Sequence, residues 1–363
     1  MSISLGKARD EIHLEADGRR RVRLTAVALV ALLILVALAS LTHGAVPVPA
    51  GRVADILIHA IEARGADPTQ DSLVVLHIRL PRLLLSMMIG AALAMAGALM
   101  QGLFRNPLAD PGLAGVSAGA GLGAALAIVL SDRVPRDLAG LSSFSLLPAA
   151  AFLGALAATS TLYAVATRGG RTSVATMLLA GVALAALASS FTGVLAYVSD
   201  DRQLRDLTFW SMGSLGGANW TKAAAMAPVT ALMLAAGPFL SRGLNALALG
   251  EAEAYHLGVR LERLKAAIVF LVAIAVGASV AAAGVISFVG IVAPHAVRLI
   301  VGPDHRALLP LSVAAGAALL TGADTLARTL VAPAEMPIGI LTAAIGAPFF
   351  LWLLISRSEG LGV

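Results

Sequence analysis

Long apolar runs separated by short polar breaks follow one another along this chain. A helix crosses the hydrocarbon core of a bilayer with about 20 apolar residues, which is the length of these runs. They are continuous and rich in Ala and Leu, whereas β-barrel strands would be shorter and would alternate apolar with polar residues. The pattern therefore predicts an all-α polytopic membrane protein with about ten transmembrane helices. The candidate spans are 23–42, 82–104, 113–130, 146–167, 174–198, 222–241, 264–282, 285–301, 307–322 and 337–355.

The same pattern divides the chain into a tail over residues 1–23, a membrane domain over 24–356 and a second tail over 357–363. The first apolar run is longer than the apolar core of a secretory signal, which has about 7–15 residues. We interpret this run as a retained helix, with cleavage near Ala45 as the alternative.

Composition supports lipid as the solvent of the folded chain. Hydrophobic residues make up 58% of the chain and charged residues 13%, whereas a soluble domain has about 25% charged residues. With the N-terminus in the cytoplasm, more of the 26 Lys and Arg residues fall inside than outside. We expect a multi-pass protein of the bacterial inner membrane with both termini cytoplasmic. The net positive charge then needs no nucleic acid to explain it, and the absence of cysteine excludes thiolate metal sites.

The acidic residues are the most informative feature of the pattern. All 21 Asp and Glu residues fall in the tails and loops between the predicted spans. A carboxylate at the bilayer centre costs about 2.5–3.5 kcal/mol and is retained mostly for ion or proton coupling. This distribution favours a conduit powered by another protein over a secondary transporter, although a sodium-coupled carrier can use backbone carbonyls.

The chain is not expected to be an enzyme. It lacks a Gly-x-x-x-x-Gly-Lys-Ser/Thr phosphate loop, so ATP hydrolysis would have to occur on a partner. No convergent catalytic set or metal-ligand cluster lies within the predicted helices, so we assign no catalytic residue, no metal site and no resident cofactor.

Three polar breaks have unusual sequences. The first, Phe104–Gly112, contains two prolines that stop a helix and fix an extended turn. The second, Leu249–Val259, has helical spacing with early acidic residues and a final glycine, but it is too short to span a membrane. The third runs from Gly284 to His295 and is closed by Arg298. Taken singly, the first two are also compatible with a tight reversal and an amphipathic connector.

Taken together, the order and spacing of these three segments resemble the FecCD-type permeases, from about Arg79 to Trp352. These are the membrane subunits of binding-protein-dependent ABC importers for siderophores, haem and cobalamin. The resemblance implies a type II ABC importer permease fold with inverted-repeat halves, and a homodimer with a central pathway. It also implies two cytoplasmic ABC ATPase subunits, which would bind ATP and Mg, and a periplasmic substrate-binding protein.

The resemblance assigns roles to two kinds of segment on the cytoplasmic side. The stretch near 250–258 resembles the coupling helix that sits in a cleft of the ATPase; its residues are Gly250, Glu251, Ala252, Glu253, Ala254, Tyr255, His256, Leu257 and Gly258. Glu251 and Glu253 are expected to meet basic residues of the ATPase or to form a solvated face. Two cytoplasmic gates are implied, the first at Asn106, Pro107 and Leu108 and the second at Thr172, Ser173, Val174, Ala175 and Thr176.

On the outer face, Arg79, Arg82 and Arg328 align with arginines that receive acidic knobs of the binding protein in some relatives. As exposed charges they would guide encounter and orientation. The alternative is that they anchor helix ends at lipid headgroups.

Two further features concern the repeat and the cargo. The motif at 79–83 recurs at 260–264, each opening a long apolar run, one expected outside and one inside. The run 104–113 is most similar to haem-importer permeases of the HmuU-like and BhuU-like group. We therefore expect haem as cargo, with a ferric siderophore or cobalamin as alternatives and an ion-coupled secondary transporter as the alternative of another class.

Overall fold

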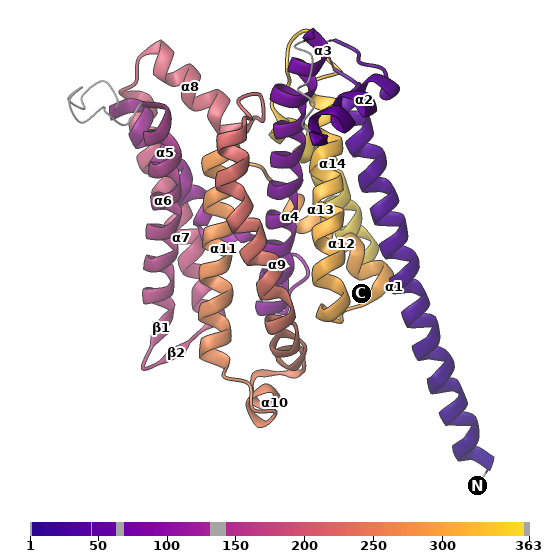
Figure 1. Ribbon diagram of the computed structural model, residues 1–363. Coiled ribbons are helices and arrows are strands. Elements are labelled where there is room, and N and C mark those ends of the chain that lie inside the picture. Colours follow the sequence, from indigo (N-terminus) through magenta and orange to yellow (C-terminus); the bar gives the residue numbers. More distant parts are fainter. Residues whose placement is uncertain (1, 45, 63–68, 131–142, 359–363) are drawn as a thin grey trace.

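The computed structural model describes residues 2–44, 46–62, 69–130 and 143–358 of the chain, and it is a bundle of helices (Figure 1). The elements are α1 (Ser2–Thr42), α2 (Ala50–Ile61), α3 (Gln70–Leu73), the π-helix η1 (Val74–Arg79), α4 (Leu80–Leu103), the 3-10 helix η2 (Pro111–Ala114), α5 (Val116–Leu130), α6 (Ser143–Ala166), β1 (Thr167–Arg168), β2 (Arg171–Thr172), α7 (Val174–Tyr197), α8 (Asp201–Ser211), α9 (Trp220–Leu249), α10 (Glu251–His256), α11 (Leu261–Ala283), α12 (Val289–Val301), α13 (His305–Ala327) and α14 (Ile338–Ser358).

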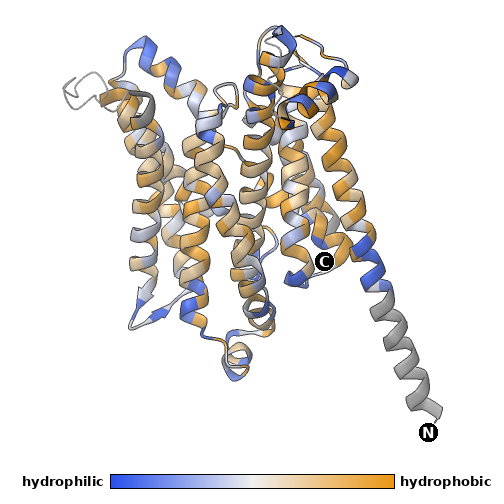
Figure 2. Ribbon diagram, in the orientation of Figure 1, coloured by the Kyte–Doolittle hydropathy of each residue, from blue (hydrophilic) through white to orange (hydrophobic). Residues whose placement is uncertain are grey.

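The predicted all-α membrane architecture is confirmed. Seven helices of the described residues are long and apolar enough to cross a membrane, and three shorter apolar helices, in α5, α12 and α14, lie on the remaining predicted runs. Figure 2 shows apolar residues along the middle of the bundle and hydrophilic residues gathered at its two ends. Of the predicted tails, residue 1 and residues 359–363 lie outside the described residues, and α1 already begins at Ser2.

The central helix of the bundle is α4, and its neighbours establish the direction of the other helices. It belongs to the span Gln70–Leu103, which is 83% buried, the highest share among the seven long spans. Helix α9 runs parallel to this span. The start of α9 contacts the start of the span, with Trp220 beside Leu76, and its end contacts the end of the span, with Leu244 beside Gly102. Helix α13 runs antiparallel to α4. We call the end of the bundle that carries α10 the α10 end, and the end that carries α8 the α8 end (Figure 1).

Two of the spans are interrupted, and their interruptions meet inside the bundle. Helix α12 begins only at Val289, after Phe288 in a left-handed conformation, and α5 begins only after the η2 turn. Pro111 of η2 lies beside Gly290 of α12, which packs against the middle of α4. This explains why these spans are shorter than predicted. The similar motifs at 79–83 and 260–264 open α4 and α11 at opposite ends of the bundle, as inverted halves require.

The contact between α4 and α12 depends on two glycines. A Cβ atom on Gly97 would lie 1.8 Å from the carbonyl oxygen of Gly290, so only glycine permits this approach of the two backbones. We expect Gly97→Ala to destabilise the folded chain by about 1–3 kcal/mol, because a backbone must shift to admit the methyl group. Thermal unfolding in detergent, followed by the loss of monodisperse protein, measures this effect.

A matched control for that substitution is Gly121→Ala in α5, where a Cβ would meet nothing within 4 Å. This variant is expected to be neutral or slightly stabilised, because alanine favours a helix over glycine by about 1 kcal/mol. Equal stability of the two variants would contradict the importance of the close contact.

One prediction about the membrane interior is wrong. Asp324 does not lie in a loop: it lies in the last turn of α13 and is 1% exposed. Glu262 likewise lies within a helix, in the first turn of α11. The predicted span 307–322 ended before α13 does, and the predicted span 264–282 began after α11 does, because in both cases the apolar run is shorter than the helix. The charge of Asp324 is compensated within the chain, because Asp324 is paired with two buried arginines.

Candidate functional site

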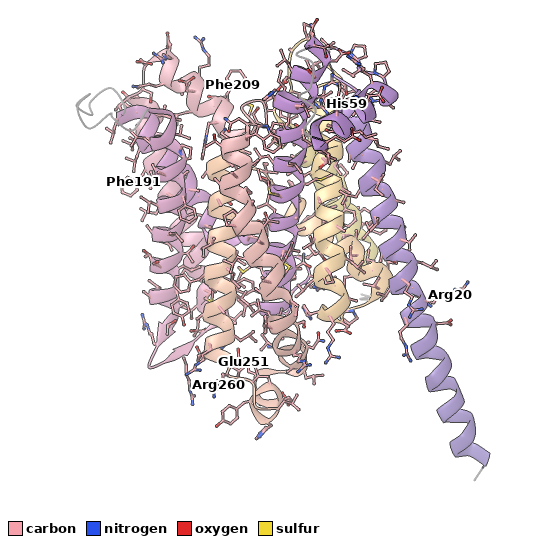
Figure 3. The ribbon with its side chains drawn as sticks, viewed as in Figure 1. Arg20, His59, Phe191, Phe209, Glu251 and Arg260 are labelled. Carbon is pink, nitrogen blue, oxygen red and sulfur yellow. The ribbon has the colours of Figure 1, made fainter. Side chains whose placement is uncertain are left out.

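The structure brings all of the predicted coupling and gate segments to the α10 end. Helix α10 follows α9 directly and projects below the bundle, and the β1–β2 hairpin between α6 and α7 lies at the same end (Figure 1). The turn 104–110 follows the last residue of α4, which runs parallel to α9 and therefore also ends here. Figure 3 shows Glu251, the first residue of α10, and Arg260 close to each other at this end.

Helix α10 is a short, separate element with one buried contact and an exposed apolar surface. Ala254 is fully buried against the bundle, whereas Tyr255 is 72% exposed and Leu257 is 64% exposed. Figure 2 places this helix outside the apolar belt, among hydrophilic residues. Large apolar side chains exposed to water at a hydrophilic end are typical of a surface that another protein covers.

The acidic residues of α10 differ in their environment. Glu251 pairs with the ammonium group of Lys265 at 3.0 Å, whereas Glu253 is exposed at the surface. The basic partner of Glu251 in this structure is therefore a residue of the chain itself, whereas the prediction placed that partner on the ATPase. The carboxylate of Glu253 folds back over Gly250 at the start of the same helix.

Lys265 is the charged residue that sequence reasoning missed. It lies in the second turn of α11 and is 1% exposed. Its ammonium group donates to the backbone carbonyl oxygen of Thr172 at 2.8 Å and contacts the carboxylates of Glu251 at 3.0 Å and Glu262 at 3.4 Å. Glu262 also accepts a hydrogen bond from the backbone N–H of Thr172 at 2.9 Å. Its position at the start of an apolar run was a sequence signal for this site, because a charged side chain in a membrane helix is costly and usually has a function.

The second predicted gate segment, Thr172–Thr176, is the junction between β2 and α7. Thr172 is buried and pairs with Thr167 across the hairpin, with their hydroxyl oxygens 2.9 Å apart. Ser173 caps α7 by accepting a hydrogen bond from the backbone N–H of Thr176 at 3.3 Å. Val174 is half-buried and Ala175 is exposed, so a small side chain is presented at the start of α7.

The first predicted gate segment is a tight turn at the end of α4. The side-chain oxygen of Asn106 accepts a hydrogen bond from the backbone N–H of Leu108 at 3.0 Å, which closes an Asx turn around Pro107. The backbone N–H of Asn106 donates to the carbonyl oxygen of Gln101 at 3.1 Å and ties the turn to the helix. Asn106 is exposed, whereas Pro107 and Leu108 are half-buried.

The expectation that Arg79, Arg82 and Arg328 are exposed is wrong. Their exposed fractions are 4%, 7% and 7%. They lie at the α8 end, where α4 begins and α13 ends, and each faces partners within the chain. Arg79 donates to the carbonyl oxygens of Leu41 and Val46. The residues before each arginine gave no sign of this burial, because the partners are distant in the chain: the end of α1 and the segment after it for Arg79 and Arg328, and two carboxylates for Arg82.

The three arginines belong to one buried cluster with two carboxylates. Arg82 forms a two-pronged ion pair with Asp324, at 2.9–3.1 Å, and donates to Glu335 at 2.8 Å. Arg328 lies 3.7 Å from Asp324 and donates to the Ser40 hydroxyl at 2.8 Å. Burial lowers the pKa of Arg328 from its usual value, and the neighbouring arginines act in the same direction. The cluster fastens the end of α1 to α4 and α13. Glu335, with 44% of its side chain exposed, is its accessible member.

Comparison with known proteins places the whole membrane domain in one family. Residues 32–356 match the FecCD transport family. The chain is 44% identical over 345 residues to the hemin transport system permease protein HmuU of Yersinia pestis, covering 94% of this chain and 98% of that protein. It is also 44% identical over 319 residues to the cobalamin import system permease protein BtuC of Halobacterium salinarum, covering 87% and 83%.

A solved structure supports the same assignment. A transporter assigned to the metal-chelate ABC type, in an inward-facing conformation, superposes with a TM-score of 0.76 at 31% identity, covering 91% of this chain and 98% of that one. The identity extends over the segments described above and not over an isolated motif. The chain therefore belongs to the FecCD transport family.

Proposed function

We propose that this chain carries haem across the inner membrane as one half of a homodimeric permease. The coarser statement follows from the family: the chain is the multi-pass permease subunit of a type II ABC importer, and its ATP is hydrolysed by a partner subunit. The proposal concerns the cargo, the stoichiometry and the residues that do the work. The observation that carries it is the meeting of α10 and both gate segments at one end of the bundle.

The coupling role rests on the exposure and charge of α10. Tyr255 and Leu257 offer an apolar contact to a cytoplasmic ATPase, and Glu253 offers a negative charge at its rim. Closure of the ATPase pair would then displace α10 as a unit. In this proposal the α10 end faces the cytoplasm, together with both termini.

The homodimer rests on the exposure of α7. Only 17% of the core of this span is buried within one chain, and its apolar side chains, such as Phe191, point outward from the flank of the bundle (Figure 3). A second copy packed against α7 would bring two segments 172–176 to a shared axis, where small residues such as Ala175 could meet and part. The Asn106–Leu108 turns would form the other gate.

A binding protein would dock at the α8 end, but through a different surface than exposed arginines. Because Arg82 is buried, an acidic knob of the binding protein would have to replace Glu335 at the guanidinium group. Glu335 is accessible, so this exchange requires movement of one side chain only. In the permease alone, Glu335 would therefore occupy the position on Arg82 that the acidic residue of the binding protein takes after docking.

Haem as cargo is supported by the hemin permease relative, which matches nearly the full length of both chains. The cobalamin permease of Halobacterium salinarum matches at the same identity over a smaller share of both chains. The vitamin B12 permease BtuC of Klebsiella pneumoniae is 41% identical over 96% of this chain and 98% of that protein, so the cargo has to be tested directly. The chain should be reconstituted in proteoliposomes with its ATPase and binding protein and offered haem, a ferric siderophore and cobalamin in separate assays. We expect ATP-dependent accumulation of haem and at least tenfold slower uptake of the others.

Two outcomes of this experiment would contradict the proposal. Preferred accumulation of cobalamin or of the siderophore would replace the cargo and leave the permease function intact. Accumulation against a gradient without nucleotide would instead support an ion-coupled secondary transporter. Empty vesicles and vesicles with an ATPase that binds but does not hydrolyse ATP are the controls.

A further inference from the structure

The buried ammonium group of Lys265 connects the projecting helix with the second gate segment. Its three partners come from three different elements: Glu251 from α10, Thr172 from β2 and Glu262 from α11 itself. The side chain of Lys265 is 2% exposed, whereas those of Glu251 and Glu262 are 46% and 37% exposed. The lysine is therefore the inner hub of the network, and the two acids lie at its rim.

Each N–H of this ammonium group has an acceptor, so all three hydrogen-bond donors of Lys265 are used. An ammonium has three donors, and three acceptors surround it here. Leaving a buried charge without its partner costs far more than breaking an exposed ion pair. When Glu251 moves, Lys265 must therefore follow it or lose one of its two carboxylate partners.

The gate segment is held by the same hub through its backbone. The carbonyl oxygen of Thr172 accepts a hydrogen bond from Lys265, and its N–H donates to Glu262, so both backbone polar groups of this residue are fixed by the network. The next residue, Ser173, caps α7. A shift of the Lys265 or Glu262 side chain therefore acts on the backbone directly before the first turn of α7.

Helix α10 is joined to the neighbouring helices through a glycine at each end. Gly250 and Gly258 flank it with φ angles of 131° and 80°, conformations in which the chain turns sharply. A short helix between two such joints needs a fixed contact to convert its displacement into movement elsewhere. The Glu251–Lys265 pair supplies such a contact.

We propose that Lys265 is a positioning residue that transmits displacement of α10 to the gate segment at 172–176. This inference rests on the proposed function, because it takes α10 as the element that the ATPase moves. It goes further by naming the path, from Glu251 through Lys265 to the backbone of Thr172. It also assigns Glu251 to this internal path and leaves the contact with the ATPase to other residues of α10.

The absence of cysteine makes the path directly measurable. Ala252 and Ala175 are both exposed, so Ala252→Cys and Ala175→Cys place nitroxide labels on α10 and on the gate segment in two separate proteins. Each label is followed by electron paramagnetic resonance in the complex with ATPase, before and after ATP. In both labelled proteins we expect ATP to change the spectrum. If neither label responds, the proposed coupling role itself fails, before Lys265 is in question.

Lys265→Met then tests the hub, because methionine fills similar space without the charge. We expect the label on α10 still to respond to ATP, the label on the gate segment to lose its response, and uptake per ATP hydrolysed to fall about fivefold or more. Lys265→Arg keeps the charge and the donors and is expected to retain more of the gate response. A gate label that responds fully in Lys265→Met, with unchanged uptake per ATP, would overturn the proposal.

A second variant keeps the test decisive if Lys265→Met fails to assemble with its ATPase. Glu251→Ala removes only the half-exposed arm on α10 and leaves the bonds of Lys265 to Thr172 and Glu262 in place. The gate label should again lose its response to ATP. The matched control is Asp206→Ala, which removes an exposed carboxylate from α8 at the opposite end of the bundle and should leave that response intact. Equal behaviour of Glu251→Ala and Asp206→Ala would reject the path through Glu251.

Discussion

Replacement of Tyr255 and Leu257 by serine in one variant is expected to abolish ATP-driven uptake by preventing stable association with the ATPase. Both side chains are well over half exposed, on a helix that projects from the hydrophilic end of the bundle. Apolar anchors of this kind contribute about 2 kcal/mol or more each when they fill a pocket of the partner. Loss of two would weaken the complex by roughly a thousandfold. Copurification of the ATPase with the tagged permease measures the association.

The control for this variant is an exposed aromatic residue at the other end of the bundle, outside the proposed dimer helix. Phe209 is 58% exposed in α8, and Phe209→Ser is expected to leave association with the ATPase unchanged. Thermal stability of the permease alone should be the same in both variants, because neither side chain packs in the core. Normal copurification of the ATPase with the Tyr255 and Leu257 variant would reject α10 as the coupling surface.

The second large effect is expected from Asp324→Ala at the α8 end. Asp324 is the buried counter-charge of Arg82 and Arg328, and its removal leaves two buried guanidinium groups with too few acceptors. Breaking a buried ion pair on one side destabilises a protein by about 3–5 kcal/mol. We expect a strongly lowered unfolding temperature in detergent and little folded protein in the membrane.

Two comparisons separate this explanation from a simple loss of packing. Glu335→Gln removes the partly exposed carboxylate of the same cluster and is expected to cost no more than about 1 kcal/mol. The double variant Arg82→Met with Asp324→Leu removes both charges of the tightest pair and should recover much of the stability lost in Asp324→Ala. If the double variant is less stable than Asp324→Ala, the uncompensated charge is not the cause.

The chain's own pattern was sufficient for the membrane architecture. A run of about 20 apolar residues is stable in a bilayer as a helix. Backbone N–H and C=O groups without hydrogen bonds are costly in lipid, and a helix forms all of these bonds within the segment. The segments at the α10 end could also be predicted from the sequence. Pro107 stops a helix, and the spacing of residues after Glu251 predicts a short one. Local chemistry decides such features, so neighbouring residues are enough to predict them.

Tertiary structure alone decided which charges are buried and what they pair with. Arg82 and Asp324 are 242 positions apart, and Lys265 and Thr172 are 93 apart, so nothing near either residue in the chain indicates its partner. The same holds for Arg79, which reads as a surface charge at a helix start until the end of α1 covers it. Burial of a charge depends on what other helices place around it, and that is fixed only when the bundle packs.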